Sequence, residues 1–160
     1  MSTRARVALA SAMLAALLIA TATALGTPSS GFTAERLGSV VITDRVDNNR
    51  AGIQVKTTKP IKVFSQRVTF APGSTSGWHH HPGVSFVSVI QGTLTSYDDK
   101  CQPSTYAAGT GFVSQRRAVH VARNEGPSNA VVLVTYLKPA PTPALPNFVD
   151  EPAPAGCAIR

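Results

Sequence analysis

The chain has 160 residues, a formal net charge of +7 and 14% charged residues. This length suits one domain that buries a single hydrophobic core. The lysines and arginines are scattered and form neither a basic helix nor an alternation with aromatic residues, which excludes a nucleic-acid-binding stripe.

The N-terminus has the pattern of a secretory signal peptide. Arg4 and Arg6 precede an apolar run over residues 7–20, and the small residues that follow end in an Ala-x-Ala sequence at Ala24. This order predicts a Sec-type signal over residues 1–24, cleavage near Ala24 and a secreted or periplasmic mature protein. The apolar run is short for a membrane span and no later segment is longer, so no stable span is expected after cleavage. A retained N-terminal anchor is the alternative.

The remainder of the chain is predicted to be all-β. Residues 25–52 form a leader that could add an edge strand at 40–42, and residues 53–138 contain short strand-like runs between glycine and proline turns. Such runs, with almost no helical periodicity, are typical of a sandwich or small barrel. The apolar run 84–91 is interpreted as a strand buried on both faces, with Ser85, Val87 and Val89 pointing inward.

All four histidines lie in two short segments. His79, His80 and His81 are consecutive, and His120 belongs to a later predicted strand. Because side chains alternate along a strand, His79 and His81 point to one side, and His120 could bring a third imidazole to the same point. Three imidazoles suit a divalent transition metal and leave a position open for water or substrate. The alternative is three surface histidines and an unrelated core histidine.

The first histidine segment resembles the first motif of the cupin family. Gly73, five residues, His79-x-His81 and a final Gly92 keep the spacing of that motif, but Ser85 stands where the family usually has a glutamate ligand. The resemblance extends over residues 61–137. It implies a single-domain conical jelly-roll β-barrel.

The second segment resembles the second cupin motif. Gly109, His120 and Asn124 keep its spacing, while Gln115 and Arg117 stand where the family has Pro and Gly. By resemblance, His120 would join the two histidines of the first motif in holding one divalent metal, which could be zinc, iron, manganese, nickel or copper.

The missing glutamate weakens the expectation of a hard metal ion. A serine hydroxyl at position 85 cannot supply a carboxylate's charge, although it could hydrogen-bond a metal-bound water. The site should therefore favour nitrogen-preferring over oxygen-preferring cations. A barrel that has lost its metal and kept its pocket is the alternative.

Five residues are candidates for the pocket around the metal. Phe70 and Phe112 would form walls, or else belong to the plain core. Arg116, if it lined the mouth, would favour an anionic small molecule, whereas solvated loop charges are the alternative. Trp78 points to the opposite side of the strand from its neighbour His79 and is predicted to pack outside the cavity. The full set is Ser85, Gln115, Arg116, Phe70 and Phe112.

Residues 139–160 form a proline-rich tail. Such proline density favours extended backbone over a central strand or a helix. The two cysteines, Cys101 and Cys157, are predicted to form a disulfide that ties the tail to the barrel, which an oxidising compartment permits. In the chain-entropy description this bridge contributes roughly 4 kcal/mol. Two unpaired thiols and a flexible wall anchor are the alternatives.

Three classes of function remain open. The first is a metal-dependent enzyme acting on a small organic molecule by dioxygenase, isomerase or decarboxylase chemistry. The second binds a metal or small ligand without turnover, and the third is a structural module. The pocket segments contain no obvious carboxylate to serve as acid or base, so the sequence does not decide between enzyme and binder. The cupin resemblance also suggests a homodimer formed through edge strands.

Overall fold

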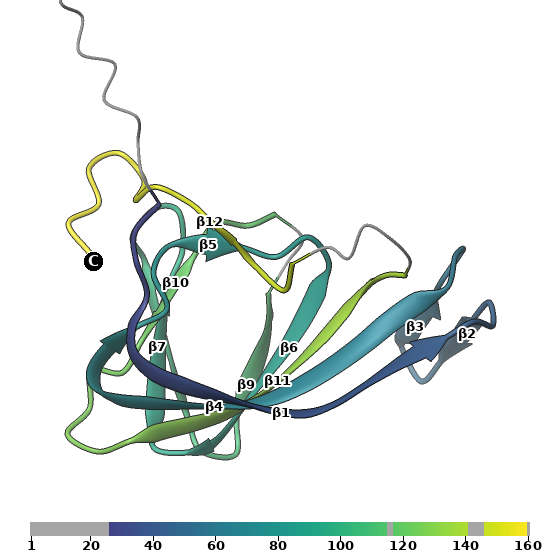
Figure 1. The fold of residues 1–160 in the computed structure, drawn as a ribbon, viewed down its shortest axis with the longest axis horizontal. Coiled ribbons are helices and arrows are strands. Elements are labelled where there is room, and N and C mark those ends of the chain that lie inside the picture. The colour runs from purple at the N-terminus through teal and green to yellow at the C-terminus, as the bar shows by residue number, and fades with distance from the viewer. Residues whose placement is uncertain (1–25, 115–116, 141–145, 160) are drawn as a thin grey trace, which may run out of the picture.

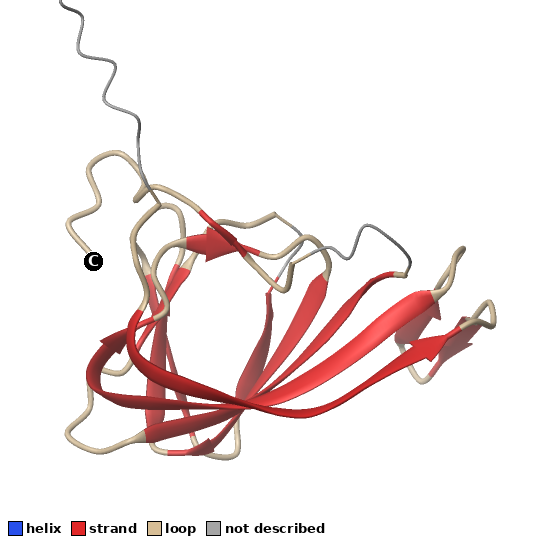
Figure 2. Ribbon diagram, in the orientation of Figure 1, coloured by secondary structure: helices blue, strands red, loops and turns tan. Residues whose placement is uncertain are grey.

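The protein is built from β-strands, and none of the residues described below is helical (Figure 2). The computed structural model describes residues 26–114, 117–140 and 146–159. The predicted signal peptide over 1–24 and the pocket candidates Gln115 and Arg116 lie outside these ranges. No helix within them is long and apolar enough to cross a membrane.

Twelve strands are present in the described residues. They are β1 (Ser30–Ile42), β2 (Asp47–Arg50), β3 (Ile53–Lys56), β4 (Ile61–Thr75), β5 (His79–His80), β6 (Val84–Gln91), β7 (Thr93–Tyr97), β8 (Pro103–Ala107), β9 (Gly111–Ser114), β10 (Val121–Arg123), β11 (Ala130–Pro139) and β12 (Val149–Asp150).

The main sheet closes into a nearly complete antiparallel barrel, as the predicted jelly-roll class requires. Its strands follow the order β8-β7-β10-β4-β11-β6-β9, and β1 pairs with β4 outside that path. The short strands β5 and β12 pair with each other across one end of the barrel, while the β2–β3 hairpin projects away from it (Figure 1). The all-β barrel fold is therefore confirmed.

The core lies inside the barrel, and period-two alternation places it there. Along β11 every second residue is buried, and the same holds for β6, where Ser85, Val87 and Val89 point inward as predicted. The outward residues of β6 remain exposed, with Phe86 at 44% and Ile90 at 45%. The interpretation of 84–91 as a strand buried on both faces is therefore wrong. A single-layer antiparallel barrel leaves its outer face to solvent, so the apolar outward residues were misleading.

The segment before the barrel contributes more sheet than the short edge strand expected at 40–42. β1 runs over thirteen residues and pairs with β4 along most of its length, from Ser30 opposite Thr75 to Ile42 opposite Ile61. The register shifts twice along this pairing, between Ser30 and Phe32 and between Arg36 and Gly38. These irregularities bend β1 around the barrel and bring Phe32 against the core.

Asn124 holds together the turn that leads from β10 to β11. Its side chain is 1% exposed and donates from Nδ2 to the carbonyl oxygens of Phe70 and Ser128, both at 2.8 Å, while its Oδ1 accepts from Gly126 N–H at 3.0 Å. A buried amide that uses its donors and its acceptor in this way fixes the loop geometry.

We expect Asn124→Ala to lower the free energy of unfolding by about 2 to 3 kcal/mol, because it leaves the backbone groups that Asn124 had satisfied without partners. Denaturant unfolding followed by circular dichroism measures this loss. Asn129→Ala, at an exposed position of the same turn, is the matched control and should change stability by less than about 0.5 kcal/mol. Equal effects of the two substitutions would contradict this account of the turn.

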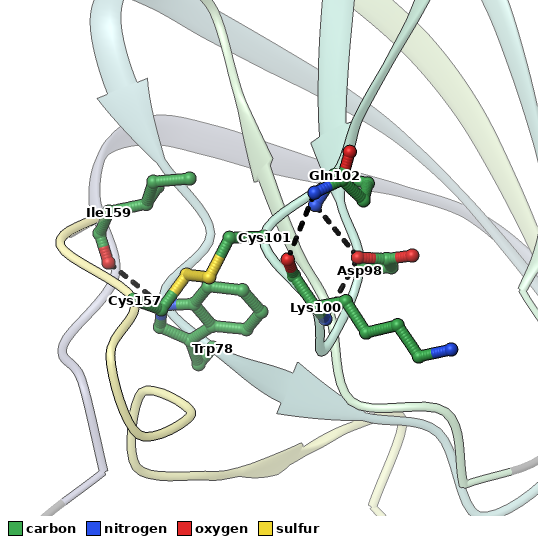
Figure 3. The surroundings of a disulfide bond; sticks show 7 residues. All are labelled: Trp78, Asp98, Lys100, Cys101, Gln102, Cys157 and Ile159. Atoms are coloured by element: carbon green, nitrogen blue, oxygen red, sulfur yellow. Dashed lines mark hydrogen bonds between the residues drawn. A yellow bond between two sulfur atoms is a disulfide. The ribbon is translucent and has the colours of Figure 1, made fainter.

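The predicted disulfide is formed between Cys101 and Cys157, whose Cα atoms lie 5.8 Å apart (Figure 3). Cys101 occupies a tight turn in the left-handed region with φ of 61°. The carboxylate of Asp98 stabilises this turn by accepting backbone N–H groups of Lys100 and Gln102, at 2.9 and 2.8 Å. The bridge joins the β7–β8 loop to the C-terminal segment, so the tail is tied to the barrel.

Candidate metal centre

Three of the four histidines meet at one end of the barrel interior. His79 lies on β5 and forms an isolated antiparallel bridge with His120, each backbone N–H donating to the other's carbonyl oxygen at 2.9 Å. Directly opposed residues of an antiparallel pair project to the same side of the sheet. His81 is two residues beyond His79 and therefore returns to that side, while His80 points away.

The imidazole rings form a compact triangle. Ring centroids are 4.3 Å apart for His79 and His120, 4.8 Å for His79 and His81, and 5.1 Å for His81 and His120. The candidate ligand nitrogens all lie within 4.8 Å of one another. Two nitrogens on one tetrahedral zinc lie roughly 3.3 Å apart at bond lengths of about 2.05 Å, so only small ring movements separate this arrangement from coordination.

Hydrogen bonds fix which nitrogen of each ring faces the common centre. The Nδ1 atoms of His79, His81 and His120 lie 2.9, 2.8 and 2.9 Å from the backbone carbonyl oxygens of Gly77, Asn147 and Ala118. A carbonyl oxygen only accepts, so each Nδ1 carries the proton and each Nε2 presents a lone pair. This orientation of a histidine by a backbone carbonyl is typical of metal ligands.

Burial keeps the rings neutral. It lowers the pKa of His79 from 6.5 to about 3, with the nearby His120 as the next largest cause, and it lowers the pKa of His81 to about 4. Burial also lowers the pKa of His120. Neutral imidazole is the form that binds metal ions, so the site is ready for a cation at neutral pH.

Just before His79, the backbone at Gly77 passes very close to the N-terminal segment. This glycine has φ of +67°, and a Cβ atom there would collide with the carbonyl oxygen of Thr27 in the passing N-terminal segment. Only glycine fits such a position without strain. The carbonyl of the same residue then receives the Nδ1 proton of His79.

A cavity of about 70 Å³ adjoins the three imidazoles and extends into the barrel. Most of its wall is apolar. Gln66, Ser76 and Tyr136 are its other polar residues, and within the described parts of the chain no carboxylate, lysine or arginine lines it. The apolar wall residues are Phe32, Val68, Phe70, Val87, Leu94, Phe112, Ala122, Val132, Val134 and Phe148.

The predicted pocket residues are only partly brought together. Phe70 and Phe112 line the cavity, whereas Ser85 does not. Ser85 is fully buried on β6 opposite Ser114 of β9, and neither hydroxyl has a hydrogen-bond partner. Arg117, next to the undescribed Gln115 and Arg116, is exposed to solvent.

Tyr136 is the main polar cavity residue that the sequence reasoning missed. Its hydroxyl accepts a hydrogen bond from Gln66 Nε2 at 3.1 Å, and burial raises its pKa to about 12. It is therefore a neutral phenol that keeps its own hydrogen to donate into the cavity. The period-two pattern of 130–137 places Val132, Val134 and Tyr136 on one face, and that signal could have revealed it.

Comparison with known proteins places the barrel among cupins. The family model described as "Cupin domain" matches residues 66–136. Germin-like protein 5-1 of Oryza sativa subsp. japonica is 29% identical over 116 residues, which cover 69% of this chain and 50% of that protein. The chain thus spans about half the length of this curated relative.

Solved structures with similar barrels include an oxalate oxidase, 29% identical over 46% of this chain and 41% of that chain, with a TM-score of 0.42. A cupin domain of an XRE-family transcriptional regulator from Enterobacter cloacae is 16% identical, over 69% of this chain and 100% of that one, with a TM-score of 0.49. A cupin barrel protein from Leptotrichia buccalis is 18% identical over 67% and 41%, with a TM-score of 0.48.

Proposed function

Because this chain belongs to the cupin family, we propose that it is an exported metalloprotein with a small-anion site. His79, His81 and His120 would hold one divalent transition metal, and a small organic anion would bind beside it in the barrel cavity. One observation carries this proposal: three buried, neutral imidazoles present Nε2 lone pairs at one cavity, each with Nδ1 committed to a carbonyl oxygen.

The donor set fits a nitrogen-preferring ion. Imidazole suits zinc, copper, iron and nickel, whereas manganese, like magnesium and calcium, prefers carboxylate and carbonyl oxygen. With no carboxylate among the described cavity residues, we place zinc, iron, copper and nickel ahead of manganese. Such an ion, when bound, supplies Lewis acidity and, if it is iron or copper, redox chemistry.

Charge balance favours an anionic ligand. Three neutral imidazoles leave the full charge of a divalent ion uncompensated, and the surrounding wall is largely apolar. A charge buried in such surroundings is unfavourable unless a counter-charge accompanies it. A carboxylate, thiolate or enolate would provide that charge. The role of Arg116 in attracting an anion stays a prediction, since this residue lies outside the described ranges.

Cavity size and Tyr136 restrict the ligand further. A volume of about 70 Å³ holds roughly five to seven water-sized groups, taking about 10 to 15 Å³ for each. The ligand is therefore a small molecule rather than a polymer. The phenol of Tyr136 would donate a hydrogen bond to its polar end, and the pKa of about 12 keeps this group from acting as a base near neutral pH.

Export is the proposed setting of this site. The signal-like sequence over residues 1–24 motivates the proposal, and the Cys101–Cys157 disulfide is compatible with an oxidising compartment.

A non-catalytic role is the second candidate, and one observation favours it. The cavity lacks a carboxylate or lysine among its described lining residues, and its three histidines would be occupied as ligands. General acid–base chemistry would then have no resident group. Oxidation of the bound anion by dioxygen does not need such a group, so this is the reaction class that the site suits if it is an enzyme.

Metal analysis tests the proposal directly. We expect protein purified from the exported fraction to carry close to one transition-metal ion per chain and the His79→Ala/His81→Ala variant less than a tenth of that. His80→Gln is the matched control, because this side chain points away from the cavity and a glutamine there can still donate a hydrogen bond to Glu151. Equally low metal content in wild type and double variant would refute the metal centre.

Oxygen consumption separates enzyme from binder. The metal-loaded protein is assayed with small thiols, catechols, enols and oxalate, the last because an oxalate oxidase is among the similar structures. Uptake that is lost in the His79→Ala/His81→Ala variant supports catalysis. Spectroscopic binding of the same anions without oxygen uptake supports the non-catalytic alternative.

A further inference from the structure

The C-terminal segment 146–159, here called the strap, lies across the end of the barrel that holds the histidines. Its strand β12 pairs with β5, with Val149 opposite His80 and Asp150 opposite His79 (Figure 1). The proline-rich composition of the tail predicted an extended segment on the surface. The structure shows that this segment lies directly beside β5, which carries the candidate ligand His79.

The strap is attached at several points. Glu151 donates its backbone N–H to the carbonyl of Trp78 at 2.8 Å, and its carboxylate contacts His80 Nδ1 at 2.7 Å. Further along, the indole Nε1–H of Trp78 donates to the carbonyl of Ile159 at 2.9 Å, beside the Cys101–Cys157 disulfide (Figure 3). These contacts hold the middle and the C-terminal end of the strap against the barrel.

One candidate ligand depends on the strap for its orientation. His79 and His120 each donate from Nδ1 to a carbonyl two residues earlier in their own segments. His81 instead donates to the carbonyl of Asn147, which is 66 residues away in sequence. The side-chain oxygen of Asn147 in turn accepts from Lys138 Nζ at 2.9 Å. The tautomer of His81 is thus set by a residue outside the barrel.

The next residue of the strap forms part of the cavity wall. Phe148 lines the cavity, and its ring centroid lies 5.4 Å from that of His79 at an interplanar angle of 65°. It is 36% exposed, so its ring stands between the cavity and solvent. Because the barrel wall itself supplies the other apolar residues, Phe148 is the part of the wall that strap movement would displace.

We propose that the strap is an integral part of the site: Asn147 positions His81 for metal binding, Phe148 limits the size of the ligand, and the disulfide keeps both in place. This inference rests on the proposed metal-binding function. It assigns a positioning role to a backbone carbonyl and a selectivity role to an aromatic side chain, both contributed by the strap.

The positioning role is tested by removing the anchor. We expect Cys101→Ser/Cys157→Ser to bind zinc at least tenfold more weakly than wild type in competition with a chromophoric chelator, because a released strap takes the Asn147 carbonyl away from His81. Serine avoids free thiols that would themselves bind zinc. Nitrogen-15 spectra of the histidine rings provide a second readout, in which His81 should lose its single tautomer while His79 and His120 keep theirs.

The selectivity role is tested with the disulfide intact. Cobalt(II)-loaded wild type should bind acetate more tightly than benzoate, measured by the cobalt absorption bands. Phe148→Ala should bind benzoate at least tenfold more tightly than wild type does, so that the ratio of benzoate to acetate affinity rises by at least that factor. Phe86→Ala, on the exposed outer face of β6, is the matched aromatic control and should leave both anions unaffected.

The outcomes are distinguishable. A wild-type protein that binds neither zinc nor cobalt overturns both the metal centre and the role of the strap. Tight zinc binding that is equal in wild type and the cysteine variant, with benzoate binding unchanged in Phe148→Ala, overturns the strap alone and leaves the proposed function standing. Should the cysteine variant fail to fold, Phe148→Ala, which retains the disulfide, decides the selectivity role. The wild-type nitrogen-15 spectra then decide the positioning role, which is overturned if His81 lacks a single Nδ1-protonated tautomer.

Discussion

Replacing Trp78 by alanine is expected to lower the free energy of unfolding by about 4 kcal/mol, since it removes a completely buried large side chain. The indole lies outside the cavity, as predicted from its position on the opposite side of the strand from His79. The C-terminal segment covers it. Its loss would leave an internal void that the surrounding strands cannot fill. The carbonyl of Ile159 would also lose its hydrogen-bond donor.

Denaturant unfolding of wild type, Trp78→Ala and Trp78→Phe separates these contributions. Phenylalanine keeps most of the buried volume but cannot donate a hydrogen bond, so Trp78→Phe should be destabilised by only about 1 to 2 kcal/mol. A loss below about 1 kcal/mol in the alanine variant would show that this residue does not join the C-terminal segment to the barrel core.

Two independent features of the sequence, strand alternation and motif spacing, predicted that three histidines could meet. Strand alternation alone put His79 and His81 on one face, and the spacing of the second motif put His120 on a neighbouring strand. The bridge between His79 and His120 brings the two segments together, and neither signal specified this direct pairing. Their role as metal ligands remains a prediction, to be settled by the metal analysis.

Other features could not be predicted, because they depend on which distant segments meet. The proline-rich tail has no periodicity that would reveal its pairing with β5, so the contact between Asn147 and His81 was not foreseen. Ser85 was predicted correctly as an inward residue but wrongly as a pocket residue. Alternation along a strand decides whether a side chain points into the barrel. Whether that side chain also reaches a cavity depends on the larger side chains around it.

The same limit explains the error at residues 84–91. An unbroken apolar run is compatible with a strand buried on both faces, and sequence alone does not show whether a second layer covers the outer face. Here no described element covers Phe86 and Ile90.

Asn124 was identified from the sequence only as a motif residue. Its structural role in the turn after β10 became visible only through its three-dimensional contacts.

The metal-free protein should lose stability as the pH falls from 7 to 5. Burial holds the pKa of His79 at about 3 and that of His81 at about 4 in the folded protein, whereas both return to about 6.5 on unfolding. Between these values the unfolded chain binds more protons than the folded one, so acid favours unfolding. The contribution of these histidines is complete above about pH 6.5 and is lost as the pH falls towards 4 to 3.

The expected size is about 2 kcal/mol for each of His79 and His81 between pH 7 and pH 5, or about 4 kcal/mol together, and the lowered pKa of His120 acts in the same direction. Urea unfolding of chelator-treated protein at a series of pH values measures this slope. The His79→Ala/His81→Ala variant should lose most of it, while His80→Gln, which can still donate a hydrogen bond to Glu151, should retain it. A wild-type slope no steeper than that of the double variant would mean that the two rings are hydrated and protonated in the folded state. The neutral donor set on which metal binding depends would then not exist at acidic pH.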